Sequence, residues 1–260
     1  MIRKLLWLEW FKLRGRLATW GVYITFLTLT IFLFGVSFYG ARHRGPYWGF
    51  PNAWEDIFAE GAPIASIFGA VLVALTVSSE FEWRTSRQSV IDGLSRKEWL
   101  LGKLLLIPAI CVVLYGTQIV LGGTLAFFDT HPPHRLFLYP PSTYATAGLG
   151  VLLGMFWYST VALLISVLVR SAGPAIGLTV IYQVFDNIVA RTLRGCHLDG
   201  IAAWLPFQVH NSLLQFRQYW PHPSPTLEDR WATADLLMTG VGWVIAFAVA
   251  ARWVHLRRDL

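Results

Sequence analysis

Charged residues are scarce in this sequence: they make up 14% of its 260 positions, against about a quarter in an average soluble domain. Hydrophobic residues make up 55%. A soluble protein of this length can bury a large core, but it does not need several separate apolar runs of about 20 residues each. The scarcity of charge between such runs predicts an all-α membrane protein.

Motifs for phosphate, metal or nucleophilic chemistry are also missing. Gly102-Lys103 has neither the upstream glycine of a phosphate-binding loop nor a following Ser or Thr, so we expect no ATP site. Neither H-E-x-x-H nor G-x-S-x-G occurs. The two cysteines, Cys111 and Cys196, have no disulfide or zinc spacing. We therefore expect no catalytic residue, no metal site and no cofactor bound by this chain.

Six apolar runs have about the length needed to cross a bilayer. Residues 2–16 precede them and have the pattern of a basic amphipathic helix that lies in the membrane interface, with Ile2, Leu6, Trp10, Leu13 and Leu17 along one stripe. The predicted spans cover about 17–40, 63–79, 104–128, 143–169, 174–190 and 232–253. The loop 191–230 is expected to contain short helices that dip into the outer leaflet, and residues 1–260 form a single transmembrane domain.

Lys and Arg are distributed unevenly between the two sets of loops. The N-terminus, the 80–103 loop, the turn at Arg170 and the C-terminus hold fourteen of the 21, and the opposite loops hold seven. Positively charged loops stay in the cytoplasm, which predicts that both termini are cytoplasmic. The net charge of +6 indicates anionic membrane lipids rather than nucleic acid, because the basic residues flank apolar spans.

The loop 80–103 carries an apolar patch at helical spacing, formed by Val90, Ile91 and Leu94. Arginines and a lysine surround this patch: Arg84, Arg87, Arg96 and Lys97. A short helix with this pattern can dock in a groove of a partner protein. It can also lie on anionic lipid, and the spacing does not choose between the two.

The same loop resembles the cytoplasmic loop between the second and third helices of ABC-2 type permeases, the membrane subunits of many bacterial ATP-binding-cassette exporters. The similarity lies in Glu80-Phe81-Glu82, Thr85, Ser95-Arg96 and Lys103. Arg84 stands where that family often has glycine, and Leu205-Pro206 is a weaker match in the external loop. The order of interfacial helix, six spans and long loop before the last span is also similar.

This resemblance implies the membrane subunit of an exporter in the bacterial cytoplasmic membrane. Its implied partners are a second permease copy and two copies of a separate ATPase subunit, which binds ATP and Mg. The resemblance also implies that the loop couples the two proteins. The implied coupling residues are Glu80, Glu82, Arg84, Arg87, Val90, Ile91, Leu94, Ser95 and Arg96.

Polar residues within the spans are candidates for a transport path, because polar groups are costly in hydrocarbon. Asp186 shares a helix face with Gln183 and Asn187, and Gln118 lies on the third span. Interhelical hydrogen bonding is the other interpretation of these residues. The apolar, aromatic-rich spans favour an amphipathic substrate such as a peptide, a lipid-linked molecule or a drug.

Two other functions remain open at this point. An ion-coupled secondary transporter is expected to show inverted repeats and broken helices, and the sequence indicates neither. A membrane-embedded enzyme is expected to show a cluster of catalytic residues, and none is evident.

Overall fold

The computed structural model describes residues 2–44, 50, 53–59, 61–83, 85, 93–128, 137, 141–198, 201, 204–206, 209 and 233–257. These residues are almost entirely helical, with no strand among them. The elements are α1 (Ile2–Arg14), α2 (Leu17–Arg44), α3 (Ala53–Ala59), α4 (Gly61–Glu82), α6 (Arg96–Phe127), α7 (Pro141–Val169), α8 (Ala172–Gly195) and α11 (Thr233–Arg257). The all-α prediction is confirmed.

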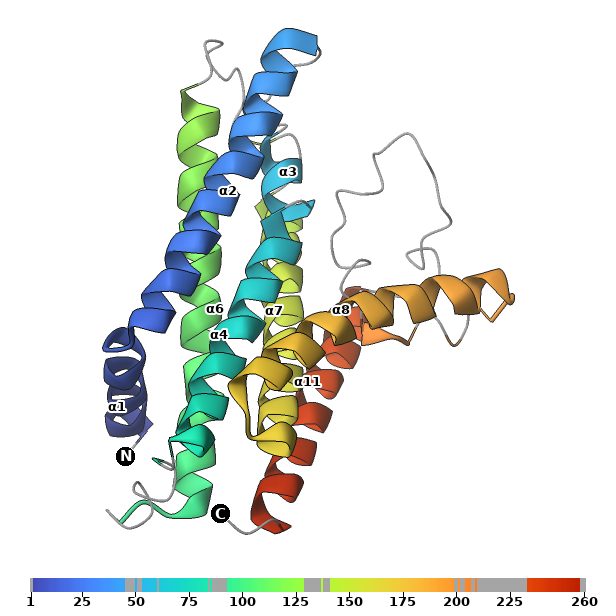
Figure 1. The fold of residues 1–260 in the computed structure, drawn as a ribbon. Helices are drawn as coiled ribbons and strands as arrows, with labels where there is room; N and C mark the ends of the chain where they lie inside the picture. The colour runs from blue at the N-terminus through green and yellow to red at the C-terminus, as the bar shows by residue number, and fades with distance from the viewer. Residues whose placement is uncertain are drawn as a thin grey trace.

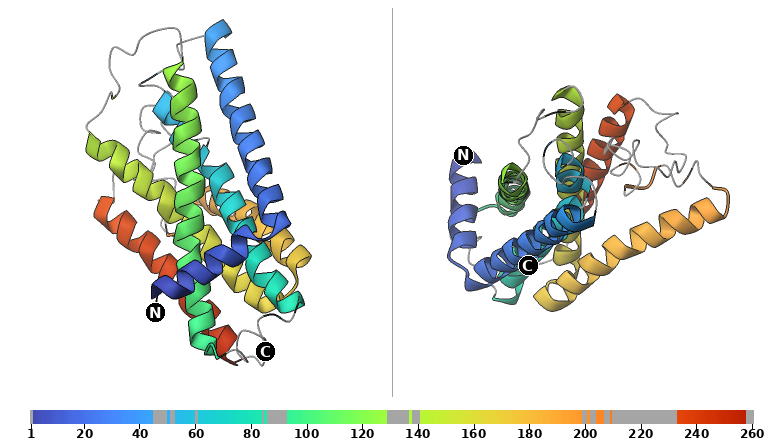
Figure 2. Two further views of the ribbon diagram at one scale, coloured as in Figure 1. Left: turned by 90° about the vertical axis from the view of Figure 1, so that its left-hand side faces the viewer. Right: turned by 90° about the horizontal axis from the view of Figure 1, so that it is seen from above.

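Five helical segments are long and apolar enough to cross a membrane: Leu17–Gly40, Asp56–Glu82, Arg96–Phe127, Tyr144–Val169 and Asp235–Arg257. They correspond to five of the six predicted spans. The remaining predicted span, 174–190, falls on α8, which is not among the five. Figures 1 and 2 show α8 leaving the bundle obliquely, whereas the other long helices run alongside one another.

The centre of the bundle is α4, which packs against α7, α8, α6 and α2. Its buried face is rich in small residues, among them Ala62, Ala65, Gly69 and Ala70. At Gly69 an added Cβ would already be in contact with Ser159 and Leu114, at 3.5 and 3.6 Å. Small residues of this kind allow membrane helices to approach closely.

The outer helices present large apolar side chains on the surface. Exposed examples on α2 include Ile24, Leu29, Ile31, Phe32 and Val36. A soluble protein rarely exposes apolar surface of this extent. The described surface therefore matches contact with lipid.

The segment α1 lies across the foot of the bundle and in front of α6 (Figure 2, left). It buries Leu5, Glu9 and Leu13, which are spaced four residues apart and share one face. Of the predicted apolar stripe, only Leu13 is in this face, while Ile2, Trp10 and Leu17 are exposed. The protein-facing stripe thus contains a glutamate that the sequence pattern did not indicate.

The N-terminus and the C-terminal end of α11 lie at the same end of the molecule (Figure 1). The end of α4, the start of α6 and the turn between α7 and α8 meet at this end too, since Glu82 and Phe81 contact Ser171 and Arg170. We call this the base of the bundle.

Candidate functional site: a charged cluster at the base

Five charged side chains from three helices and one link meet at the base. Glu9 and Lys12 belong to α1, Arg16 lies between α1 and α2, Glu80 is in the last turn of α4, and Lys103 is in the third turn of α6. We call these five residues the charged cluster. Glu9, Glu80 and Lys103 are each no more than 3% exposed at their side chains, so the cluster is closed to solvent at its centre.

At that centre, Lys103 joins two carboxylates. Its Nζ donates to Glu80 Oε1 at 2.7 Å and also to Glu9 Oε2. Trp99, one turn earlier on α6, donates its indole N–H to Glu80 Oε2 at 2.8 Å. A buried ion pair is tolerated only when its remaining polar atoms are also satisfied, and the tryptophan meets that requirement at Glu80.

Gly102 allows Glu9 to reach the cluster. An added Cβ on Gly102 would lie 3.3 Å from Cγ of Glu9, closer than a relaxed carbon contact. The backbone of α6 therefore passes directly against the α1 glutamate. At this position a larger residue would push the Glu9 side chain by a few tenths of an ångström, so close approach favours glycine here.

Arg16 holds the end of α4. Its guanidinium donates to the carbonyl oxygen of Thr76 at 3.0 Å and to Oγ of Ser79 at 2.6 Å, and it lies 3.4 Å from Glu80 Oε1. The C-terminal end of a helix carries partial negative charge, and Thr76 and Ser79 lie in the last two turns of α4, which ends at Glu82. A cation at this position therefore stabilises the end of α4 and fixes the link between α1 and α2.

The charges of the cluster nearly balance. Lys12 lies 3.5 Å from Glu9 Oε1 and 3.6 Å from Glu80 Oε1. Three cations thus face two carboxylates. The surplus positive charge falls on Lys12 and Arg16, whose side chains are 29% and 16% exposed, where water can solvate it.

The two residues after Glu80 make contacts with other elements. Phe81 packs edge-on against Trp99 with ring centres 5.4 Å apart, and the guanidinium of Arg170 lies 5.4 Å from its ring centre. Glu82 accepts hydrogen bonds from Ser171 Oγ at 2.8 Å and from the backbone N–H of Ala172 at 2.7 Å. It therefore caps the start of α8, as carboxylates do at helix N-termini.

The last helix joins the same structure through His255 on α11. This side chain is 1% exposed and stacks on Trp99, with ring centres 4.9 Å apart and planes 19° apart. Trp99 is thus shared by Glu80, Phe81 and His255. Through these contacts, the segment Glu80–Glu82 is connected to α1, α6, α8 and α11.

The predicted coupling residues that follow Glu82 in the chain fall into two groups. Arg84, Arg87, Val90 and Ile91 lie outside the described residues. Leu94, Ser95 and Arg96 lie at the start of α6, where Ser95 is the N-cap: its Oγ accepts from Glu98 N–H at 3.2 Å, and Glu98 accepts from Ser95 N–H at 2.8 Å. This reciprocal capping box fixes the point where the connector ends and α6 begins.

Glu80 is 1% exposed, so its side chain contacts the protein interior and not the surface. Its role as a coupling residue stays a prediction. Glu9 and Lys103, its partners, were not among the predicted site residues. The signal for Glu9 was a single acid spaced four residues from Leu5 and Leu13 on an otherwise basic helix.

The predicted path residues are spread over two helices. Gln118 on α6 is fully buried, and an added Cβ on Gly61 would come within 2.1 Å of its Nε2. Asp186 on α8 is 5% exposed and interacts electrostatically with Tyr158 and Tyr182. The side chains of Gln183 and Asn187 lie outside the described residues.

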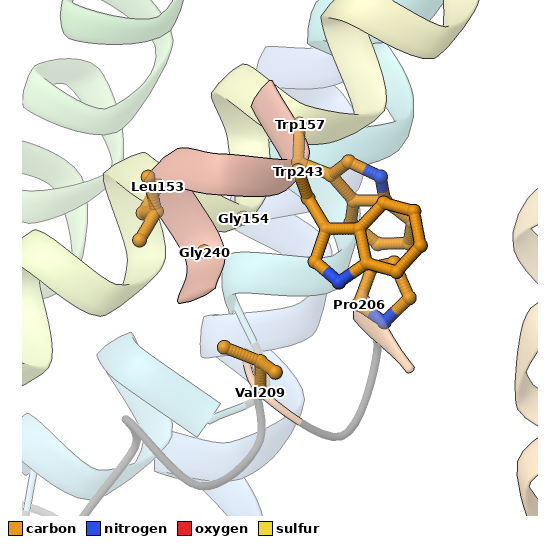
Figure 3. Close-up of a pocket in the computed structure, with 7 residues that line it drawn as sticks. All are labelled: Leu153, Gly154, Trp157, Pro206, Val209, Gly240 and Trp243. Atoms are coloured by element: carbon orange, nitrogen blue, oxygen red, sulfur yellow. The ribbon is translucent and has the colours of Figure 1, made fainter. Parts of the chain in front are cut away.

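A small cavity lies where the segment after α8 returns to the bundle (Figure 3). Its volume is about 10 Å³, which is room for one water molecule. It is therefore a small gap between packed helices and is too small for a substrate. Leu153, Gly154, Trp157, Pro206, Val209, Gly240 and Trp243 line it. Nε1 of Trp243 donates to the carbonyl oxygen of Trp204 at 2.9 Å, which anchors the Leu205-Pro206 segment against α11.

These features define a class of protein: the apolar helices are consistent with a multi-pass membrane protein, and the base carries a buried ionic cluster. The chain belongs to the family described as "Protein of unknown function (DUF2705)", whose model matches residues 49–260. The matched part includes Glu80 and Lys103, while Glu9 precedes it. A search of curated proteins found no match.

Proposed function

We propose that this chain is the permease subunit of an ATP-binding-cassette exporter in the bacterial cytoplasmic membrane. Two copies would form the translocation pathway, and two copies of a separate ATPase subunit would bind ATP and Mg and drive it. The substrate would be amphipathic. In this arrangement both termini are cytoplasmic, and α8 is the fifth of six spans.

The observation that carries the proposal is the attachment of the connector between α4 and α6. It leaves α4 next to Glu80 and Glu82 and enters α6 at the Ser95 cap. Glu80 is bonded to Lys103, Trp99 and Arg16, and Glu82 to the start of α8. A displacement of the connector would therefore move several helices together, which is what a coupling element must do.

This attachment separates two roles within the predicted loop. The buried residues Glu80 and Lys103 act as positioning residues that make the base rigid. The docking surface would be formed by Val90, Ile91 and their neighbouring arginines. Conformational work then comes from the ATPase binding one arrangement of the permease more tightly than the other.

The orientation agrees with this role. The N-terminus, the end of α4, the start of α6 and the end of α11 share the base (Figure 1), and the basic loops that predict the cytoplasmic side belong to these same segments. An ATPase at the cytoplasmic face would meet the connector there.

The test is the variant Ile91→Asp in the full chain. An unpaired carboxylate buried in a docked groove costs several kcal/mol, so we expect loss of ATPase pull-down and of transport in liposomes, with normal membrane insertion. Arg87→Glu is the matched comparison, and it should weaken the complex less, because exposed ion pairs contribute about 1 kcal/mol or less.

An Ile91→Asp protein that inserts, still binds the ATPase and still transports would contradict the proposal. Purification from native membranes without any co-purifying ATPase, together with transport driven by an ion gradient, would instead favour a secondary transporter.

A further inference from the structure

A second feature near the base is a cavity beside α1, and Leu13, from the same buried face of α1 as Glu9, is part of its lining. It lies between α1, the start of α2 and the middle of α6, and its volume is about 300 Å³, within the range of small-molecule binding sites. Most of its lining is apolar or aromatic. The lining residues are Trp10, Leu13, Arg14, Thr19, Trp20, Tyr23, Leu72, Ile110, Val113 and Leu114.

One cation stands in this apolar lining. Arg14 is exposed at the end of α1 and has no carboxylate partner among the described residues. The indole N–H of Trp20 donates to the carbonyl oxygen of Arg14 at 2.9 Å, which fixes the backbone at this point. The cavity therefore combines an apolar interior with an unpaired positive charge held at its edge.

The surroundings of the cavity match the interface of a membrane. Trp7, Leu8 and Phe11 of α1 are exposed, as are the cations Arg3 and Lys4. The one acid of α1, Glu9, is buried against Lys103, so the exposed surface of α1 carries only positive charge. Such a helix binds anionic lipid at the headgroup level.

We propose that this cavity binds an anionic phospholipid of the surrounding membrane, with one acyl chain between α1, α2 and α6 and the headgroup phosphate at Arg14. The bound chain would fill space that side chains leave open, and it would hold α1 in the position where Glu9 reaches Lys103. This site does not depend on the proposed transport function.

The neighbouring space supports a lipid rather than a small polar ligand. A wider apolar cleft of about 720 Å³ adjoins the cavity, and Trp10 and Val113 line both. The cleft is open to the outer face of α6, where Val112 is 56% exposed. A lipid chain can therefore enter sideways from the bilayer.

The experiment measures lipid retention by native mass spectrometry of the full chain in detergent micelles, titrated with phosphatidylglycerol or phosphatidylcholine of identical acyl chains. We expect tighter retention of phosphatidylglycerol. Val113→Trp fills the cavity and should weaken retention of both lipids about tenfold or more, equivalent to losing about two buried methylene groups. Val120→Trp, two turns further along α6 and 65% exposed, is the control and should change neither.

The headgroup is tested by Arg14→Gln, which should lower the preference for phosphatidylglycerol about fivefold and leave phosphatidylcholine unchanged. Lys4→Gln, an exposed cation of the same helix that lines neither space, is its control. Val113→Phe is a smaller plug, to be used if the tryptophan variant does not fold.

Equal retention by Val113→Trp and Val120→Trp would show that only the ordinary lipid annulus is bound and would overturn the proposal. Equal effects of Arg14→Gln and Lys4→Gln would overturn the assigned headgroup position.

Discussion

Replacing Lys103 by methionine should separate α1 from the rest of the base. Methionine keeps the length and apolar character of the side chain but removes the buried amine that donates hydrogen bonds to both Glu9 and Glu80. Breaking a buried ion pair by removing one partner costs about 3–5 kcal/mol. For a chain of this size each kcal/mol lowers the melting temperature by about 2–4 °C, so a fall of about 6–20 °C is expected in a mild-detergent melt.

The structure also predicts which of the two carboxylates loses more of its stabilising contacts in Lys103→Met. Without Lys103, Glu80 keeps the Trp99 N–H at 2.8 Å, Arg16 at 3.4 Å and Lys12 at 3.6 Å. Among the described residues, Glu9 keeps only Lys12, at 3.5 Å. Adding Glu9→Gln to Lys103→Met should therefore restore more stability than adding Glu80→Gln, because it neutralises the less satisfied charge.

The assay compares the melting temperatures of the single and double variants, with Lys4→Met as the control for loss of an exposed lysine. Close partners of this kind show coupling energies of about 0.5–3 kcal/mol in such cycles. If Lys103→Met melts within 2 °C of Lys4→Met, or if Glu9→Gln and Lys103→Met act additively, the cluster does not hold the base together and the reasoning is wrong.

Two further predictions concern packing and topology. Gly240→Ala should destabilise the bundle by about 1–3 kcal/mol, because the added Cβ would lie 2.4 Å from Cδ2 of Leu153. The control is Gly242→Ala, whose Cβ would have no atom within 4 Å and which should leave the melting temperature unchanged. Equal effects of the two variants would contradict the assigned contact between α11 and α7. A reporter active only in the cytoplasm should work when fused after Leu260 and fail when inserted at 221–226, and the reverse pattern would place the base outside the cell.

Hydropathy was sufficient to predict the apolar helices, because a run of about 20 apolar residues has few other stable environments. The helix α6 extends beyond the predicted span at its start. The helix begins at Arg96, whereas the predicted span begins at about 104, because Arg96, Lys97 and Glu98 were interpreted as loop. The capping box of Ser95 and Glu98 was visible in the sequence and would have placed the boundary correctly.

The partners of Lys103 could not be predicted in the same way. Glu9 lies 94 residues away along the chain and Glu80 lies 23 residues away. Local pattern carries no information about which distant charges meet. A lysine near the end of a span is most simply interpreted as one that reaches the interface with its charge in water. Lys103 is buried between Glu9 and Glu80 because α1 crosses α6 next to Gly102.

Apolar side chains at the charged cluster could stabilise the packing of α1, α4 and α6 as strongly as the ion pairs do. An ionic contact differs from apolar packing in how strictly it fixes the positions of the helices. Apolar side chains tolerate small sliding, since a methyl group contacts one neighbour almost as well as the next. The Nζ of Lys103 satisfies Glu9 and Glu80 together in only one placement of α1, α4 and α6, because a displaced carboxylate would remain buried without a partner. In the proposed permease, the connector from α4 to α6 would need such a defined register to pass a push from an ATPase to the spans. A cluster that makes intermediate positions costly would move the base as a unit, so that the helices change position together rather than one at a time.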